Sequence, residues 1–169
     1  KSKMESVICK DFKIKCSIQG KINYSFFPSP RIKLKDFIIQ DPSNVGKNLA
    51  TVEDVVLKIS PYNLSNKKKI NITKIELINA EIDFDLDKFN DYKIFYAKKF
   101  NSLPINLKKG EIKFTEGKKY ITTIKDVNFR YNSNNITEEA SLKGIFLGDN
   151  IYINFKNDKN SKKASKVLL

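Results

Sequence analysis

Apolar and polar residues alternate with a period of two along most of this chain, and this pattern constrains the fold more than any other feature of the sequence. From Phe12 to Gln19 every even position is apolar and every odd position is polar. The same alternation returns in roughly ten stretches of strand length, the last ending near Phe155. Because each stretch has one apolar and one polar side, the pattern predicts a mostly β protein with an antiparallel sheet covered on one face.

Three sites interrupt the alternation in the same way, at Lys35-Asp36, Glu53-Asp54 and Lys125-Asp126. At each site two consecutive polar residues separate apolar positions that are three apart. A regular strand would turn half of these apolar side chains into water, whereas one inserted bulge residue would restore their facing and bend the strand. A simple turn between two short strands is the alternative. In either case we expect a bent sheet, and the shared motif suggests an internal structural repeat.

One long helix is expected between Asp87, which can cap it, and Asn101, just before the helix-ending Leu103-Pro104. Its aromatic residues recur at steps of three and four and form a single stripe, made of Phe89, Tyr92, Phe95, Tyr96 and Phe100. We expect this stripe to pack on the apolar face of the sheet as core. The alternative is a lid or plug over an apolar channel.

Lysine supplies nearly all of the positive charge behind the formal net charge of +13, since only Arg31 and Arg130 are arginines. Base readout and bidentate phosphate contacts favour the planar guanidinium of arginine, so we expect no nucleic-acid partner. The joint excess of Lys, Asn and Ile is typical of an AT-rich genome, whose codons favour these residues. A lysine-rich surface would also be attracted to anionic lipid head groups, by about 1 kcal/mol for each lysine near the membrane.

Two cysteines, Cys9 and Cys16, stand seven positions apart. On one extended strand this separation would far exceed the reach of a disulfide. A turn near Lys10-Asp11 would bring the two together, but a buried free thiol is the expected state of Cys16.

The ends of the chain carry little information about targeting. No stretch approaches the roughly 20 consecutive apolar residues of a membrane-spanning helix, and no secretory signal precedes the first strand. The chain begins with Lys1 rather than methionine, which leaves room for an upstream targeting or anchoring segment. We expect one domain over residues 1–156, followed by a polar, lysine-rich tail or linker over residues 157–169.

Side chains suited to catalysis are scarce in this sequence. The chain has no histidine, so the commonest general base at neutral pH and the usual zinc ligand sets are missing. The one notable carboxylate cluster is Asp83, Asp85 and Asp87, which alternation places side by side on one strand face. Its oxygens could bind a cation, but we expect a solvated side opposite the apolar residues of the strand. We therefore expect no enzyme activity, no metal and no cofactor.

Several motifs follow one another along the chain: FPSPRIKLKDF at residues 27–37, preceded by Gly20, then ATVEDVVLKIS at 50–60, PYNL at 61–64, INITKIELINAEIDF at 70–84, KGEIKF at 109–114 and LKGIF at 142–146. In this order they resemble the signature elements of the AsmA family, over residues 18–155. Two positions depart from the family pattern. Ala80 stands where proline is usual, and residues 87–90 replace the usual D-G-x-x-N.

The resemblance implies a bacterial envelope protein, anchored in the inner membrane by an N-terminal helix and projecting into the periplasm. The family belongs to bridge-like lipid carriers with a long, taco-shaped β-groove that act in phospholipid transport and outer-membrane homeostasis. For this chain it implies a bent antiparallel sheet that forms a half-barrel or taco-like groove. The implied partners are phospholipid acyl chains, the membrane and envelope proteins.

The apolar sides of the predicted strands favour lipid binding on physical grounds as well. Each CH₂ of a lipid tail buried against them would contribute about 0.8 kcal/mol, so affinity would need no polar contact. The residues that we expect to line this face are Ile14, Cys16, Ile18, Ile22, Tyr24, Phe26, Ile32, Leu34, Leu57, Ile59, Ile82, Phe84, Phe114, Phe129 and Phe146.

Two other hypotheses compete with lipid transfer. In the first, the helix closes the apolar face completely, and the domain is a protein-interaction scaffold in outer-membrane assembly with no open lipid site. In the second, the lysine-rich surface binds nucleic acid, which predicts an affinity that falls steeply with salt.

Overall fold

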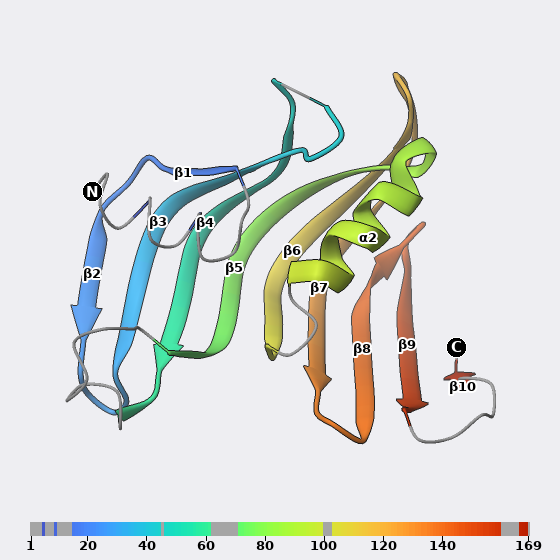
Figure 1. The fold of residues 1–169 in the computed structure, drawn as a ribbon. Helices are drawn as coiled ribbons and strands as arrows, with labels where there is room; N and C mark the ends of the chain where they lie inside the picture. The colour runs from blue at the N-terminus through green and yellow to red at the C-terminus, as the bar shows by residue number, and fades with distance from the viewer. Residues whose placement is uncertain are drawn as a thin grey trace.

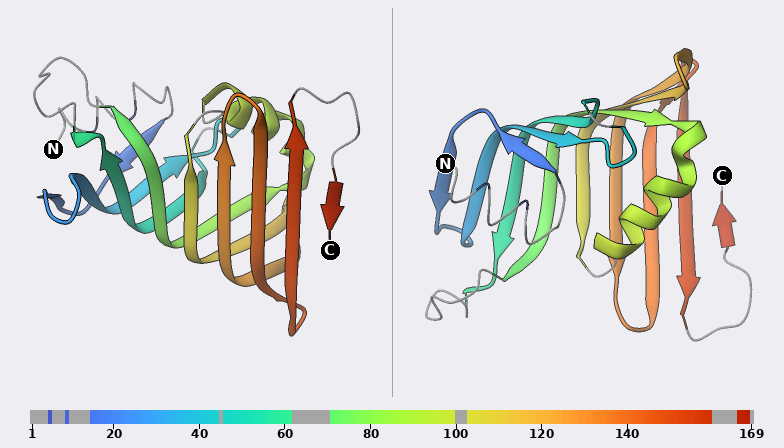
Figure 2. Two further views of the ribbon diagram at one scale, coloured as in Figure 1. Left: turned by 90° about the horizontal axis from the view of Figure 1, so that it is seen from below. Right: turned by 45° about the horizontal axis from the view of Figure 1, so that its top comes forward.

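The alternating stretches of the sequence form one open β-sheet with a helix on one side, which confirms the expected mostly β fold (Figure 1). This computed structural model describes residues 5, 9, 15–44, 46–61, 71–99, 103–159 and 166–168, with only the backbone described for residues 95–99 and 166–168. The described sheet has ten strands, and its two edges lie on opposite sides of the molecule (Figure 2).

The strands lie side by side almost in the order of the sequence: β1-β3-β4-β5-β6-β7-β8-β9-β10, with β2 also paired to β3. Their bounds are β1 (Cys16–Ile18), β2 (Ile22–Ser25), β3 (Arg31–Gln40), β4 (Asn48–Ile59), β5 (Ile72–Asp85), β6 (Ile105–Glu116), β7 (Lys119–Ser133), β8 (Thr137–Phe146), β9 (Asp149–Asp158) and β10 (Lys166–Leu168). Among these described strands, β5 and β6 form the one parallel pair in an otherwise antiparallel sheet. The chain between them crosses back through a 3-10 turn, η2 (Leu86–Lys88), and the helix α2 (Phe89–Lys99), and a parallel pair requires such a crossover.

The helix is shorter than the sequence predicted. Asp85 Oδ1 accepts the backbone N–H of Asp87 at 3.2 Å and so caps η2, while α2 has 11 residues and begins only at Phe89. The first part of the predicted helix is therefore a separate 3-10 turn. Figure 1 shows α2 crossing in front of β6 to β8. Of the family-like PYNL turn, residues 62–64 lie outside the described residues.

The sheet is bent along a line that crosses successive strands, which we call the crease. It is formed by Asp36 of β3, Glu53 of β4, Asn79 of β5, Lys109 of β6 and Asp126 of β7. Four of these residues have a positive φ, between 49° and 53° (Asp36, Asn79, Lys109 and Asp126). A non-glycine residue in this left-handed conformation is uncommon, and its repetition at corresponding positions of neighbouring strands bends the sheet as a whole.

The crease explains the interruptions of the alternation. In β3 the buried residues change from Ile32 and Leu34 to Phe37 across Asp36, and the strand continues without a turn. At Lys125-Asp126 the pairing of β7 with β8 shifts by one residue, which confirms the predicted bulge. At the other two sites the prediction of one inserted residue is wrong. The apolar positions of β3 and β4 shift by one residue at the same place in both strands, so the pairing of the two strands continues without a break from Lys35 to Phe37.

Gly20 and Gly144 lie so close to the backbone of the neighbouring strand at the crease that a side chain would not fit at either position. A Cβ atom on Gly20 would lie 2.5 Å from Asp36 Oδ2 and 2.8 Å from the carbonyl oxygen of Lys35. A Cβ atom on Gly144 would lie 3.0 Å from the carbonyl oxygen of Lys125. The glycines of two family-like motifs therefore have a direct steric reason at the bent part of the sheet.

The C-terminal residues continue the sheet where they are described. Strand β9 extends to Asp158, and β10 pairs with it antiparallel, with Val167 opposite Phe155. Part of the range 157–169 thus contributes strand backbone to the sheet.

Candidate functional site: the apolar face of the sheet

Apolar side chains of successive strands share one side of the sheet, which we call the apolar face. Its central row runs in register from β3 to β9 through Leu34, Val55, Leu77, Leu107, Phe129, Leu142 and Ile153. A second row runs through Ile32, Leu57, Ile75, Ile105, Tyr131, Ala140 and Phe155. A third row, beyond the crease, runs through Ile39, Ala50, Ile82, Ile112, Ile124 and Phe146. The face is therefore continuous across strands whose residues lie more than 100 positions apart in the sequence.

The N-terminal part of the apolar face, on β3 to β5, is mostly closed core. Nine of its side chains are between 0% and 6% exposed: Ile32, Leu34, Phe37, Ala50, Val52, Val55, Leu57, Ile75 and Ala80. Ile18 of β1 belongs to the same cluster. Burial of this extent makes the N-terminal part the main source of hydrophobic stabilisation in the sheet.

The C-terminal part of the apolar face, on β7 to β9, is more open. Its half-buried residues are Phe129, Leu142, Phe146, Ile151, Ile153 and Phe155. Val127 and Tyr131 of β7, at 0% and 5% exposed, are buried there. Half-buried residues of the face already occur on β5 and β6, among them Leu77, Ile82 and Phe114, so the apolar surface becomes more accessible from β5 toward β9.

The structure divides the residues that we expected to line this face into three groups. The buried group is Ile18, Ile32, Leu34 and Leu57, and the half-buried group is Cys16, Ile22, Ile59, Ile82, Phe84, Phe114, Phe129 and Phe146. Tyr24 and Phe26 are exposed near the turn between β2 and β3, and Ile14 lies outside the described residues. The structure thus brings most of the set together on one face. Tyr24 lies opposite Ile32 and is an exposed member of this face on the edge strand β2, whereas Phe26 lies beyond the end of β2.

Sequence reasoning missed several residues of the C-terminal part. Leu142, Ile151, Ile153 and Phe155 belong to the rows described above or lie beside them, yet none was in the expected lining. The signal that could have found them is the same alternation, since all four occur at apolar positions of predicted strands.

The helix α2 is attached to the apolar face at its first turns. The ring of Phe84 on β5 lies 6.1 Å from that of Phe89 and 4.8 Å from that of Tyr92, between centroids. Phe114 of β6 completes the cluster at 5.7 Å from Phe84. Of the remaining predicted stripe, Phe95 and Tyr96 lie where only the backbone is described, and Phe100 lies outside the described residues.

A buried hydrogen bond holds the start of α2 against the connection between β3 and β4. The hydroxyl of Tyr92 donates to Asp41 Oδ2 at 3.0 Å, and Asp41 is itself 4% exposed. Asp41 Oδ1 accepts from the N–H and the hydroxyl of Ser43 at 2.8 and 2.7 Å. Burial, with help from the hydrogen bond and charge of Asp41, raises the pKa of Tyr92 to about 12, so this tyrosine remains a donor at neutral pH.

The opposite side of the N-terminal part carries an ionic network. Asp54 forms ion pairs with Lys33 at 2.9 Å and with Lys35 at 3.6 Å. Glu76, which is 9% exposed, is surrounded by three ammonium groups at 3.2 to 3.6 Å, those of Lys58, Lys74 and Lys108. Burial alone would raise the pKa of Glu76, but the hydrogen bonds and charges of these lysines outweigh it and hold the pKa below its ordinary value.

The carboxylates Asp83, Asp85 and Asp87 do not form the row that alternation predicted. Strand β5 ends at Asp85, so Asp87 lies in η2 and not on the strand. Asp85 is 9% exposed and accepts the backbone N–H groups of Asp87 and Gly117, which makes it a structural cap and not a solvated residue. Across the parts of the chain that the structure describes, no three or more His, Cys, Asp or Glu side chains gather closely enough to hold a metal ion.

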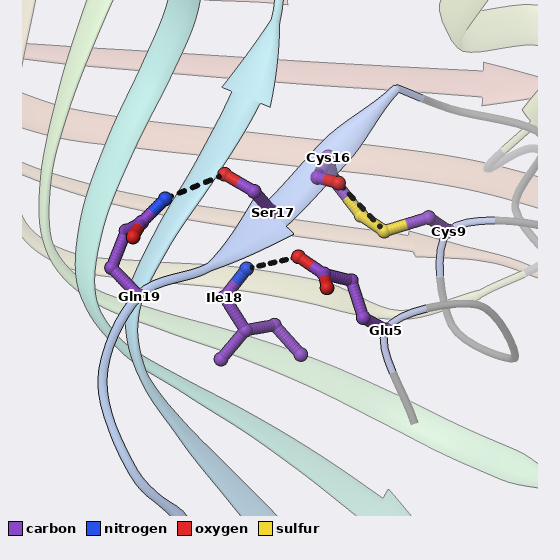
Figure 3. The surroundings of a disulfide bond; sticks show 6 residues. All are labelled: Glu5, Cys9, Cys16, Ser17, Ile18 and Gln19. Carbon is purple, nitrogen blue, oxygen red and sulfur yellow. Dashed lines mark hydrogen bonds between the residues drawn. A yellow bond between two sulfur atoms is a disulfide. The ribbon is translucent and has the colours of Figure 1, made fainter. Parts of the chain in front are cut away.

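The two cysteines form a disulfide, with a Cα–Cα distance of 5.6 Å (Figure 3). The expectation of a free thiol at Cys16 is wrong. β1 begins only at Cys16, so Cys9 lies outside the strand and the span of one extended strand does not keep the two cysteines apart. Glu5 Oε1 accepts the backbone N–H of Ile18 at 2.8 Å and provides a second link to the same strand (Figure 3). Residues 5 and 9 are thus both joined to the edge of the sheet.

Comparison with known proteins supports a relationship at the family level. A family model described as "AsmA family" matches residues 1–164, nearly the whole chain, and no curated protein sequence matches it. The family is associated with the bacterial envelope and is generally a non-enzymatic family of lipid transport. None of the helices in the described residues is long and apolar enough to cross a membrane. With its bent sheet, its crease glycines and a match of this length, the chain belongs to the AsmA family.

Proposed function

We propose that this protein is a non-enzymatic lipid-binding module of envelope lipid transport, and that acyl chains bind the C-terminal part of its apolar face. The observation that carries the proposal is the change in exposure along continuous apolar rows. Leu34 and Leu142 lie in the same row, yet Leu34 is fully buried and Leu142 is half-buried. Accessible apolar side chains in register with a closed core form a surface that hydrocarbon can cover without disturbing the fold.

The dimensions of this surface suit an acyl chain. Strands β8 and β9 have 10 residues each, which at about 3.3 Å per residue corresponds to a length of roughly 33 Å. This length is comparable to the ~30 Å hydrocarbon thickness of a whole bilayer and exceeds one leaflet. A lipid tail could therefore lie along the strands, or across them along one of the apolar rows.

The chemistry of the face favours hydrocarbon with little selectivity. The proposed lining of the C-terminal part is aliphatic and aromatic: Phe129 and Phe146 from the predicted set, with Leu142, Ile151, Ile153 and Phe155. Ile82, Phe84 and Phe114 of the predicted set border it on β5 and β6. Each CH₂ that leaves water against it would contribute about 0.8 kcal/mol. In this proposal the buried residues Ile18, Ile32, Leu34 and Leu57 support the surface and do not touch the lipid.

The disulfide favours an oxidising compartment as the site of action. Disulfides persist in the periplasm and in other oxidising environments and are rare in the cytosol. Together with family membership, the Cys9–Cys16 bond supports a periplasmic location for this module. Anchoring to the inner membrane is part of the same proposal.

The test is a pair of substitutions at neighbouring positions of β8. Phe146 lies on the apolar face and Ile145 on the opposite side of the same strand, and both are half-buried. We expect Phe146→Asp to lose most of the phospholipid that co-purifies with the protein and to slow lipid transfer between vesicles. Ile145→Asp should retain both, as measured by native mass spectrometry and a fluorescent-lipid transfer assay.

Two results would contradict the proposal. One is a wild-type protein that carries no phospholipid after mild purification and is not stabilised when lipid is added back. The other is equal lipid loss in the two variants, which would mean that lipid binding does not depend on the apolar face.

A further inference from the structure

The turn between β2 and β3 presents the most exposed aromatic side chains of the described residues. Tyr24, Phe26 and Phe27 are 61%, 71% and 84% exposed. They are consecutive or nearly so in sequence and lie at the end of the sheet where β3 begins. We call Tyr24, Phe26 and Phe27 the aromatic tip. Contiguous exposed apolar side chains of this kind mark an interaction site more often than single ones do.

The backbone of the aromatic tip is held in place by side chains from both strands. The carbonyl oxygen of Phe27 accepts a hydrogen bond from Ser25 Oγ at 3.0 Å. The same oxygen accepts a second one from Arg31 Nη2 at 3.1 Å. A tip fixed in this way loses less conformational entropy when it meets a partner than a free loop would.

Cationic side chains adjoin the aromatic tip on the side of the sheet opposite the apolar face. Arg31, Lys58 and Lys74 lie next to one another in register across β3, β4 and β5. Lys33, Lys35 and Lys108 lie in the next rows, so that five lysines pair with the two carboxylates of Asp54 and Glu76. Arg31 adds a sixth cation and bonds to the carbonyl oxygen of Phe27. The excess of positive charge makes an anionic partner favourable here.

Beyond the crease, the same side of the sheet carries mixed charges, with Asp83 opposite Lys113. Glu81 of β5 and Glu111 of β6 stand side by side in register, and Glu53 lies in the crease itself with Asn79 as its hydrogen-bond partner at 2.6 Å. An anionic surface would therefore attract the end of the sheet that carries the aromatic tip more strongly than the other end.

We propose that the aromatic tip and its adjoining cations form a membrane-docking site that seats this end of the sheet on an anionic phospholipid bilayer. Aromatic side chains partition into the interfacial region of a bilayer, and each lysine or arginine near an anionic surface adds to the attraction. A protein partner would supply acidic groups but would not require a pair of adjacent phenylalanines in solvent. This docking is independent of lipid bound on the apolar face, so the two proposals can fail separately.

A tryptophan reporter tests the contact directly, because the chain contains no tryptophan. Phe27→Trp places one at the aromatic tip, and Leu147→Trp places one in the turn between β8 and β9, where Leu147 is 80% exposed. With vesicles of phosphatidylcholine and phosphatidylglycerol, the emission of Phe27→Trp should shift to the blue and be quenched by lipids brominated on their acyl chains. The emission of Leu147→Trp should not change.

A flotation assay with the same vesicles measures the strength of docking. We expect the double variant Phe26→Ser/Phe27→Ser to lower the partition coefficient by about tenfold or more, and added salt to weaken wild-type binding. The matched control Tyr120→Ser/Leu147→Ser, which removes two exposed apolar side chains far from the aromatic tip, should bind as the wild type does. Equal thermal melting of all variants establishes that they are folded.

Three results would overturn the proposal. One is an emission of Phe27→Trp that does not change when anionic vesicles are added. Another is an equal blue shift of both tryptophan reporters. The third is a blue shift that occurs without vesicles and increases with protein concentration. This result would mean that the aromatic tip mediates self-association. Loss of docking with normal lipid content in native mass spectra would leave the function of the apolar face intact.

Discussion

Strands β3 to β5 and strands β7 to β9 carry the same alternating pattern, yet the two parts of the apolar face end in different environments. In the N-terminal part the central row is represented by Leu34 and Val55, at 0% and 3% exposed. In the C-terminal part the same row continues through Leu142 and Ile153, which are half-buried. The difference teaches that alternation assigns a residue to a face, while the elements packed over that face decide whether it becomes core or an accessible surface.

The side facing the solvent differs between the two parts as well. Behind the N-terminal part, Glu76 is 9% exposed and has three lysine partners. Behind the C-terminal part, Glu139 pairs with Lys156 at 2.8 Å while both side chains remain at least half exposed. Ion pairs contribute more where water is excluded, so the N-terminal part is the more firmly held on both sides of the sheet.

The largest expected effect comes from truncating the same residue type in each part. We expect Leu34→Ala to lower the free energy of unfolding by about 2–5 kcal/mol, because it removes buried methyl groups and leaves a cavity. Leu142→Ala should cost about 1 kcal/mol, since its side chain is already partly in water. Urea denaturation followed by circular dichroism measures both, and equal losses would contradict the division of the face.

Acidification tests the ionic network behind the N-terminal part. The pKa of Glu76 is held below its ordinary value of 4.5, so its contribution is present above pH 4.5 and is lost as the pH falls below it toward the folded-state value. We expect Glu76→Gln to lower the free energy of unfolding at neutral pH by about 1–2 kcal/mol. The free energy of unfolding of this variant should also fall less on acidification than that of the wild type.

Glu139→Gln is the matched control for this comparison, because its pair with Lys156 lies in the C-terminal part and is exposed. Chemical denaturation between about pH 3 and pH 7, the range in which carboxylates titrate, should give this variant a free energy of unfolding close to that of the wild type. An equal change in the free energy of unfolding of Glu76→Gln and Glu139→Gln would mean that ion pairs stabilise the N-terminal and C-terminal parts equally.

A smaller effect is expected from the hydroxyl that anchors α2. Tyr92→Phe removes the donor to buried Asp41 and should cost about 1 kcal/mol. Because the folded-state pKa of Tyr92 is raised from 10.0 to about 12, this contribution is present below pH 10 and is lost as the pH rises toward 12. Tyr152→Phe, on the exposed side of β9, should leave thermal stability unchanged, and a similar loss in both variants would contradict the anchor.

The smallest effect concerns the crease between the two parts. Lys109 of β6 has a φ of 53°, a conformation that glycine adopts without steric cost. We expect Lys109→Gly to raise the free energy of unfolding by about 0.5 kcal/mol. Lys113→Gly in the same strand should lower it by about 0.5–1 kcal/mol, and thermal denaturation of the two variants checks the opposite signs.

Much of the sheet was predictable from local patterns. Alternation placed Ile32, Leu34 and Leu57 on one face, and their register confirms this. The repeated polar pairs predicted a bend at Asp36 and Asp126, and both residues have a positive φ. Such features depend on the two-residue period of the strand and on near neighbours, which the sequence contains directly.

The errors of prediction fall where distant contacts decide. Asp85 was expected to face water, but the N–H of Gly117, 32 positions later, makes it a buried cap. Cys16 was expected as a thiol, but Cys9 meets it from outside the strand. The expectation of inserted residues in β3 and β4 failed because the two strands change phase together. None of these contacts has a local signature.

By itself, the sequence determined the apolar side of most strands, the bends in β3, β4 and β7 and the family, because each of these depends on residue type at fixed short spacing. The bends at Asn79 and Lys109 had no such pattern. Tertiary structure alone decided that Leu34 is buried while Leu142 is half-buried, that Tyr92 reaches Asp41, and that Phe26 and Phe27 project from the end of the sheet beside Arg31. The physical reason is that burial depends on what covers a face, and the covering segments come from parts of the chain that the local pattern does not relate to one another.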